Sequence, residues 1–421
     1  MKNEKNIYDI IVAGGGPAGL AAAVGAARCG SKVLLIEKNG YIGGMGTING
    51  AICGLYTSSK NKKLEQLVQG FAGEFYEEMK KKNGVAIPYP FGDTNIVVHD
   101  HLVWREVADE LLEKAGVEVI FHTIVTDVIK FENEIKGIVI ENKAGRMEIF
   151  AKRFIDCTGD GDVAVKAGVP YTIGKNGNIQ YATMIFRMGN VDVKKATSYT
   201  IKEIEKLINI AISKGYNLPR KHIYILPSPR PNEIVCNMTA ITNRDGSSID
   251  STDAKQMSYG EIEGRKQVRE YERFLKEYIS GFENAILVDV GNELGIRQSR
   301  TIQCKQTLTN KNIFESQKFE HSIAKSAWCI EAHGKDGIFM YYLEDDFYEI
   351  PYETMLPLKI DNLMVAGRLI CAEHEALASA RVVAQCLLTG YAAGVGSSLS
   401  LQDNCYPKDV EFSKIKAIID Y

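Results

Sequence analysis

The chain has 421 residues, of which 45% are hydrophobic and 24% are charged, and its formal net charge is -3 at pH 7. This length predicts two or three domains, and the composition is that of a soluble globular protein. A net charge so close to zero argues against a nucleic-acid-binding protein, which would carry an excess of basic residues. The nine cysteines are an odd number at scattered spacing, which favours a reducing cytoplasm.

The N-terminal segment has the pattern of a strand, a glycine-rich turn, a helix and a second strand. An apolar run over residues 7–13 leads into Gly14-Gly15-Gly16-Pro17-Ala18-Gly19, a helix is predicted over 20–27, and a strand over 32–36 ends at Glu37. In such a G-x-G-x-x-G turn the glycines permit a tight bend, close approach of a pyrophosphate, and close helix–strand packing. An acid at the tip of the second strand accepts ribose hydroxyls. A plain glycine turn would not account for that acid, so we predict a dinucleotide site.

The same segment carries no charge over residues 10–27, which raises the question of a membrane span. The Gly-Gly-Gly-Pro interruption favours a buried strand and helix instead. A basic start and a small-residue cleavage pattern are also missing. We therefore expect neither a membrane span nor a secretory leader.

Downstream of Glu37 the pattern predicts several further elements. Residues 43–54 are dense in glycine, an amphipathic helix is predicted over 64–82, and Asp100 is expected to cap a helix that ends near Gly116. From residue 117 the pattern predicts a strand and then a β-meander, whose last strand runs into the turn at 158–162.

The C-terminal half predicts a chain that leaves the first domain and returns to it. Residues 181–352 alternate strands and helices with no second G-x-G-x-x-G after a strand. The chain then closes with a short strand over 363–366, a turn at Gly367 and a long small-residue helix over 378–399. We predict an α/β protein with a discontinuous nucleotide-binding domain (1–183 and 352–421) and an inserted α+β substrate domain (184–351).

Taken together, these stretches resemble the FAD-dependent oxidoreductase family of the glutathione-reductase superfamily. The resemblance rests on six motifs: residues 14–19 with Glu37, the loop at 43–47, FIDCTGDGD at 154–162, ELGIRQSR at 293–300, AWCIEAHG at 327–334, and NLMVAGR at 362–368. It implies a Rossmann-type FAD-binding domain and a resident FAD.

The resemblance also implies which residues hold the cofactor. Those at the pyrophosphate and the adenosine are Gly14, Gly15, Gly16, Pro17, Ala18, Gly19, Glu37, Lys38 and Val125. Those along the ribityl chain and the flavin are Gly44, Thr47, Gly159, Gly367, Arg368 and Ala380. Many relatives place an acid where Arg368 stands, so its contact, to phosphate or to substrate, is left open.

The chemistry is narrowed by what the sequence lacks. No C-x-x-C occurs, which argues against a disulfide reductase. No second nucleotide-binding unit is found that would predict a nicotinamide-binding domain. Hydride transfer to or from a small carbon substrate remains, and this chemistry needs an acid–base group. In a strand over 328–333, Glu331 and His333 lie on one face and form a candidate pair. The alternative is a polar, solvent-facing strand edge.

Further candidates are basic. Arg297 and Arg300 are suited to bind a carboxylate or a developing negative charge, with interdomain salt bridges as the alternative. His374 follows the last glycine turn and is expected to act near the flavin. The alternatives are a polar lining of the site and a helix-capping role. His99 and His101 have a metal-ligand spacing without a third ligand, so no metal is expected.

We therefore expect an enzyme, an FAD-dependent oxidoreductase acting on a CH–OH or CH–CH group of a small polar substrate. A flavin-bearing electron-transfer subunit and a monooxygenase-like enzyme are the alternatives. The electron donor or acceptor is unknown, and homo-oligomer formation is left open.

Overall fold

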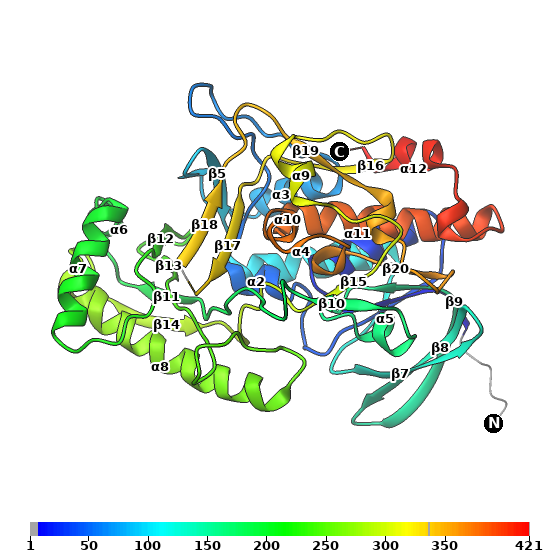
Figure 1. Ribbon diagram of the computed structural model, residues 1–421, viewed down its shortest axis with the longest axis horizontal. Helices are drawn as coiled ribbons and strands as arrows, with labels where there is room; N and C mark the ends of the chain where they lie inside the picture. Colours follow the sequence, from blue (N-terminus) through cyan, green and yellow to red (C-terminus); the bar gives the residue numbers. More distant parts are fainter. Residues whose placement is uncertain (1–6, 336, 421) are drawn as a thin grey trace.

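The computed structural model describes residues 7–335 and 337–420 of the chain (Figure 1). Its central sheet has seven strands among these residues. Five strands are parallel, in the order β6 (Glu118–Ile120), β2 (Val33–Ile36), β1 (Ile7–Ala13), β9 (Gly145–Asp156) and β20 (Leu363–Val365). The apolar side chains of residues 10–13 in β1 and those of β2 and β20 are buried, as expected for strands covered on both faces.

The predicted β-meander is confirmed. β7 (Ile124–Phe131), β8 (Glu134–Asn142) and the first half of β9 are antiparallel neighbours. The second half of β9 pairs instead with β1 and β20. This long strand therefore carries the chain from the meander back to the end of β1, where the glycine turn lies.

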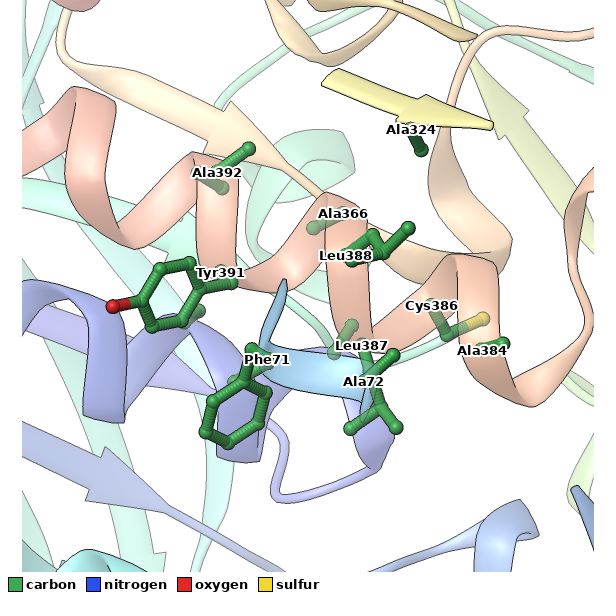
Figure 2. Close-up of a cluster of buried hydrophobic side chains, with 14 of the residues drawn as sticks. Phe71, Ala72, Ala324, Ala366, Ala384, Cys386, Leu387, Leu388, Tyr391 and Ala392 are labelled. Carbon is green, nitrogen blue, oxygen red and sulfur yellow. The ribbon is translucent and has the colours of Figure 1, made fainter. Parts of the chain in front are cut away.

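Two helices of small residues pack tightly beside the sheet. They are α1 (Pro17–Arg28) and α11 (Val383–Gln402). A Cβ added to Gly390 or to Gly394 would lie 2.1 Å from the backbone oxygen of Ala18 or of Ala22, so only glycine permits this approach. Figure 2 shows α11 from its other side, where Tyr391 stacks on Phe71 of α3 (Gly70–Lys81) with ring centroids 5.2 Å apart.

The structure confirms one predicted helix and changes two others. Asp100 caps α4 (His101–Ala115) by accepting a hydrogen bond from Leu102 N at 2.8 Å, and Gly116 ends it in the left-handed conformation. The helix predicted from residue 64 begins only at Gly70. The helix predicted over 378–399 is two, α10 (His374–Ala380) and α11, because Val382 has an extended backbone with ψ of 164°.

Among the described residues no single helix is long and apolar enough to cross a membrane. α10 and α11 together meet the length and composition criteria, but they are bent by 89° at their junction.

A second sheet lies at one end of the molecule, drawn in green in Figure 1. Its antiparallel order is β12 (Tyr224–Pro227), β13 (Ile234–Asn237), β11 (Phe186–Gly189) and β14 (Ile286–Val290). It is accompanied by α6 (Val193–Ala196), α7 (Ile201–Ser213) and α8 (Ala254–Tyr278). Its buried cluster draws on residues 182–296 alone. The domain limits at 183/184 and 351/352 stay a prediction.

The remaining short strands and helices lie outside these two sheets. The strands are β3 (Ala51–Ile52), β4 (Tyr89–Phe91), β5 (Thr94–Val98), β10 (Tyr171–Ile173), β15 (Arg300–Ile302), β16 (Ser322–Ser326), β17 (Ile330–Gly334), β18 (Gly337–Tyr341) and β19 (Tyr348–Pro351). The helices are α2 (Met45–Asn49), α5 (Asp162–Lys166), α9 (Asn310–Phe314) and α12 (Phe412–Ile419). One buried apolar cluster joins Phe91, Tyr224, Trp328 and Val382, which come from four separate segments. The site described next lies against this cluster.

Candidate functional site

The glycine turn between β1 and α1 combines close packing with open space. Gly14 has a φ of +95°, and a Cβ there would lie 2.4 Å from Cys157 O. A Cβ on Gly19 would lie 1.7 Å from Gly14 O. A Cβ on Gly16, in contrast, would meet no heavy atom of the described residues within 4 Å beyond its chain neighbours, and Gly16 lines a cavity. The first and last glycines serve packing, and the middle one faces a ligand space.

Glu37 is fixed at the tip of β2 by backbone donors. Its Oε2 accepts a hydrogen bond from Gly15 N at 2.6 Å, and its Oε1 accepts one from Asn39 N at 2.7 Å. Burial raises the pKa of this carboxyl, although the two hydrogen bonds oppose the rise. Both Glu37 and Asn39 line the cavity, and Asn39 Nδ2 is buried without a partner among the described residues.

The cavity continues along the predicted cofactor path. It runs from Glu37 past the glycine turn to Gly367 and the start of α11, and its non-atom space is about 1350 Å³ with the open mouth included. Ten predicted cofactor residues line it: Gly14, Gly16, Pro17, Ala18, Glu37, Lys38, Gly44, Gly159, Gly367 and Arg368. Of the described residues, Gly15, Gly19, Thr47, Val125 and Ala380 were also predicted but are not part of this lining.

Three of these five still support the cavity indirectly. Gly15 N holds Glu37, and the Thr47 hydroxyl donates a hydrogen bond to Gly44 O at 2.8 Å, which braces the loop beneath the cavity. Ala380 is the last residue of α10 and precedes Arg381, which does line the cavity.

Arg368 is held by the turn that follows β9. Its Nη2 lies 3.1 Å from Asp160 Oδ1, and its Nη1 donates a hydrogen bond to Ser299 Oγ at 2.9 Å. Burial raises the pKa of Asp160, but the Arg368 guanidinium outweighs that effect and the pKa is lowered overall. Asp160 was not predicted as a site residue, although it stands in the sequence motif that ends at residue 162.

A second, smaller cavity holds the predicted acid–base pair. Glu331, His333 and Arg297 line it, and His333 Nε2 lies 3.1 Å from Glu331 Oε1. β17 therefore places Glu331 and His333 on one face, as predicted, and this face is buried instead of solvent-facing. Arg297, Arg381 and Val382 line both cavities, so the two spaces meet at these residues.

The electrostatics define the protonation state of this pair. Burial raises the pKa of Glu331, but the hydrogen bond from His333 and the charges of Arg297 and Arg220 outweigh it and lower the pKa to about 2. Burial and the charge of Arg297 lower the pKa of His333, so its imidazole is neutral at neutral pH. A carboxylate only accepts hydrogen bonds, so the proton of the neutral imidazole is on Nε2 and the lone pair is on Nδ1. The pair thus presents a neutral base oriented by an ionised acid.

The other predicted basic residues go to different places. Arg297 Nη1 donates to Tyr181 O at 2.6 Å, and Arg381, which was not predicted, donates from Nη2 to Gln180 Oε1 at 2.9 Å. Arg300 Nη1 instead lies 3.6 Å from Asp162 Oδ1. This ion pair corresponds to the salt bridge given above as the alternative to ligand binding. No local pattern identified Arg381, because it lies inside a stretch that the sequence predicted as continuous helix.

His374 is not brought to the acid–base pair. It lines a separate cavity together with Cys371, Glu373 and Asn310. His99 is fully buried, and its Nε2 lies 2.7 Å from Gly46 O, so it supports the glycine-rich loop. Among the described residues no group of three or more His, Cys, Asp or Glu side chains is arranged to hold a metal ion.

The parallel sheet, the strand–turn–helix geometry, the acid at the tip of β2 and the long cavity define a Rossmann-type dinucleotide-binding protein. The model of the family described as "FAD dependent oxidoreductase" matches residues 9–419. The chain belongs to this family.

Individual relatives match smaller parts of the chain. A thiamine thiazole synthase of Methanococcus aeolicus is 34% identical over 165 residues, which are 37% of this chain and 57% of that protein. Digeranylgeranylglycerophospholipid reductase 2 of Methanothermobacter thermautotrophicus is 29% identical over 172 residues, which are 38% of this chain and 42% of that protein. In both cases the match spans less than two thirds of the relative. A geranylgeranyl bacteriochlorophyll reductase-like protein of Thermoplasma acidophilum, 17% identical, has a TM-score of 0.50 over 98% of this chain and 83% of its own, which shows the fold.

The residues present fit the FAD that this family uses. Gly16 leaves open the position that a side chain would fill, at the N-terminus of α1, where a helix favours phosphate. Asn39 offers a buried, unpartnered donor beside Glu37 at the adenosine end. At the other end α11 begins at the cavity without a side-chain cap, and Val382, Val383 and Cys386 line that space.

Proposed function

We propose that this enzyme transfers a hydride between FAD and a CH–OH or CH–CH group of a small polar substrate, as a member of the glutathione-reductase superfamily. The observation that carries the proposal is the shared boundary of the two cavities at Arg297, Arg381 and Val382. It puts the Glu331–His333 pair in the space next to the expected flavin end. FAD supplies the hydride acceptor when it is bound.

The chain's own residues would manage the proton. In the oxidation of an alcohol, His333 Nδ1 takes the hydroxyl proton while Glu331 holds Nε2–H and stabilises the imidazolium that forms. In the reverse direction the same imidazolium returns the proton. Glu331 is then a positioning residue for His333. The aromatic walls, Phe91, Tyr224 and Trp328, keep water away from the exchange.

The proposal also assigns a role to the inserted region. Glu331, His333 and Trp328 stand within residues 184–351, while Arg381 and Val382 belong to the C-terminal return. We propose that the predicted substrate domain closes the substrate space over the flavin end of the FAD domain. A reducing compartment such as the cytoplasm is supported by the nine cysteines, none of which is in a disulfide.

The test is anaerobic reduction of the bound flavin by a panel of small alcohols and hydroxy acids, followed by absorbance. A substrate should bleach the flavin, and His333→Asn should slow the bleaching about a hundredfold or more without loss of flavin. Glu331→Gln should slow it less, about tenfold, because its amide oxygen still accepts the Nε2–H. Glu263→Gln on the surface of α8 is the control.

Two outcomes would contradict the proposal. Bleaching at the wild-type rate in His333→Asn would remove the proton-transfer role. Rapid reoxidation in air together with hydroxylation of the substrate would indicate a monooxygenase.

A further inference from the structure

The walls of the substrate cavity carry more positive than negative charge. Arg297 and Arg381 line the cavity directly. Arg220 lies behind it, where Nη1 donates to Asn237 Oδ1 at 2.8 Å and the guanidinium stacks over the Tyr224 ring, 5.1 Å from its centroid. Asn237 and Tyr224 are both part of the lining. Three guanidinium groups from three separate segments therefore converge on one small space.

A single carboxylate faces these three groups. Glu331 acts electrostatically on Arg220, Arg297 and Arg381 alike. The nearby Arg368 is already paired with Asp160, and His333 is neutral. The formal balance around the cavity is thus three positive charges against one negative charge.

The guanidinium groups also retain unused donors. Arg220 Nη2 and Arg381 Nε are buried without a hydrogen-bond partner among the described residues. Arg220 and Arg297 are buried, and Arg381 is partly buried. A buried charge without a counter-charge is strongly unfavourable, and so is a buried donor without an acceptor. Such an arrangement is expected where a ligand supplies the missing acceptors.

The remaining walls are apolar and aromatic. Phe91 stacks on Trp328 with centroids 5.1 Å apart and lies 4.9 Å from Tyr224, and Leu226 and Val382 complete this side. The non-atom space of the cavity, with its open mouth included, is about 500 Å³. Polyvalent anions such as inorganic phosphate would leave the aromatic side unfilled.

We infer that the substrate of this enzyme is a small organic carboxylate whose apolar or aromatic body packs against Phe91, Tyr224 and Trp328. Its carboxylate is bound by Arg297 and Arg381, and the positive charge of Arg220 lies behind this wall. The inference rests on the proposed function and names the substrate class for the same site. Arginine is suited to this role because its planar fork binds a carboxylate in a bidentate manner.

The experiment is an anaerobic titration of the FAD-loaded enzyme with benzoate and with benzamide, its uncharged isostere, read by the change in the visible flavin spectrum. Benzoate should bind about tenfold more tightly or better, the size expected for charge-assisted hydrogen bonds. Arg220→Gln removes a positive charge behind the lining, so it should weaken benzoate binding by a smaller factor and leave benzamide binding unchanged. Arg220→Lys, which keeps the charge, should recover most of the affinity.

The outcomes separate this inference from the proposed function. Equal binding of benzoate and benzamide, or no spectral change with benzoate, would overturn the carboxylate assignment and would indicate that the guanidinium groups serve the flavin alone. Flavin reduction by neutral alcohols in such a protein would leave the hydride-transfer proposal standing. Tight benzoate binding without flavin reduction by any member of the panel would support the carboxylate site and contradict the hydride-transfer proposal. Flavin content and melting temperature in each variant show that the fold is intact.

Discussion

Arg368 and Asp160 form an ion pair of 3.1 Å that ties the turn after β20 to the turn after β9. Both turns line the cofactor cavity, and the pair is mostly buried. Gly159 lies beside the pair with a φ of +82°, a backbone conformation that favours glycine. The ion pair therefore fixes the relative position of two walls of the cavity.

Removing this pair should loosen the cofactor. Asp160→Asn leaves a buried guanidinium without its counter-charge, and we expect a loss of about 1–3 kcal/mol, seen as at least about tenfold weaker FAD binding. The measurement is flavin retained after dialysis and rebinding by fluorescence. Asp162→Asn, two residues on and outside the cavity lining, should retain its flavin. Equal retention in both variants would show that the pair does not position the walls.

The glycine turn should respond in two different ways to added side chains. Gly16→Val meets open space at a φ of −68°, so the protein should fold and yet leave no room for the pyrophosphate. Gly19→Ala would bring a Cβ within 1.7 Å of Gly14 O, so it should fail to fold stably. Circular dichroism and flavin absorbance distinguish these results. A folded Gly16→Val protein with normal flavin content would move the cofactor away from this turn.

The packing of α1 against α11 gives a stability prediction. Gly394→Ala would place a Cβ 2.1 Å from Ala22 O and so force the two helices apart, and we expect a loss of about 1–3 kcal/mol or more in the free energy of unfolding. Gly73→Ala in α3 is the matched control, because its Cβ would make only ordinary contacts of 3.4–3.6 Å and alanine favours a helix by about 1 kcal/mol. Thermal melting of the two variants should shift in opposite directions. A shared small shift would contradict the tight helix pair.

His99 should make the protein sensitive to acid. Burial lowers its pKa from the ordinary value of 6.5 to about 3 in the folded state. Between these values the unfolded state binds the additional proton, so stability is present above about pH 6.5 and is lost as the pH falls toward 3. From pH 7 to pH 5 this histidine accounts for about 2 kcal/mol.

The check compares wild type with His99→Gln, whose amide nitrogen can still donate to Gly46 O but does not titrate in this range. Melting temperatures at pH 7 and pH 5 should differ more for wild type than for the variant. His101 and His333 also have lowered pKa values, so a residual acid sensitivity is expected in both proteins. An identical pH dependence would mean that His99 titrates normally when folded.

The sequence by itself determined the parts that depend on near neighbours along the chain. The order of strand, glycine turn, helix and acid predicts the β1–α1–β2 unit, since each glycine reports a backbone requirement within a few residues. The alternation in β17 correctly put Glu331 and His333 on one face. The meander and the Asp100 cap follow from equally local patterns.

Only the tertiary structure decided what the site contains beyond these units. No proline or glycine next to Val382 marks the break between α10 and α11, and it is this break that brings Arg381 to both cavities. Arg220, Arg297 and Glu331 come from segments separated by up to 111 residues of chain (331 − 220 = 111). Their meeting depends on how two sheets pack against one apolar cluster, and this long-range packing leaves no periodic trace in the sequence around any one of them.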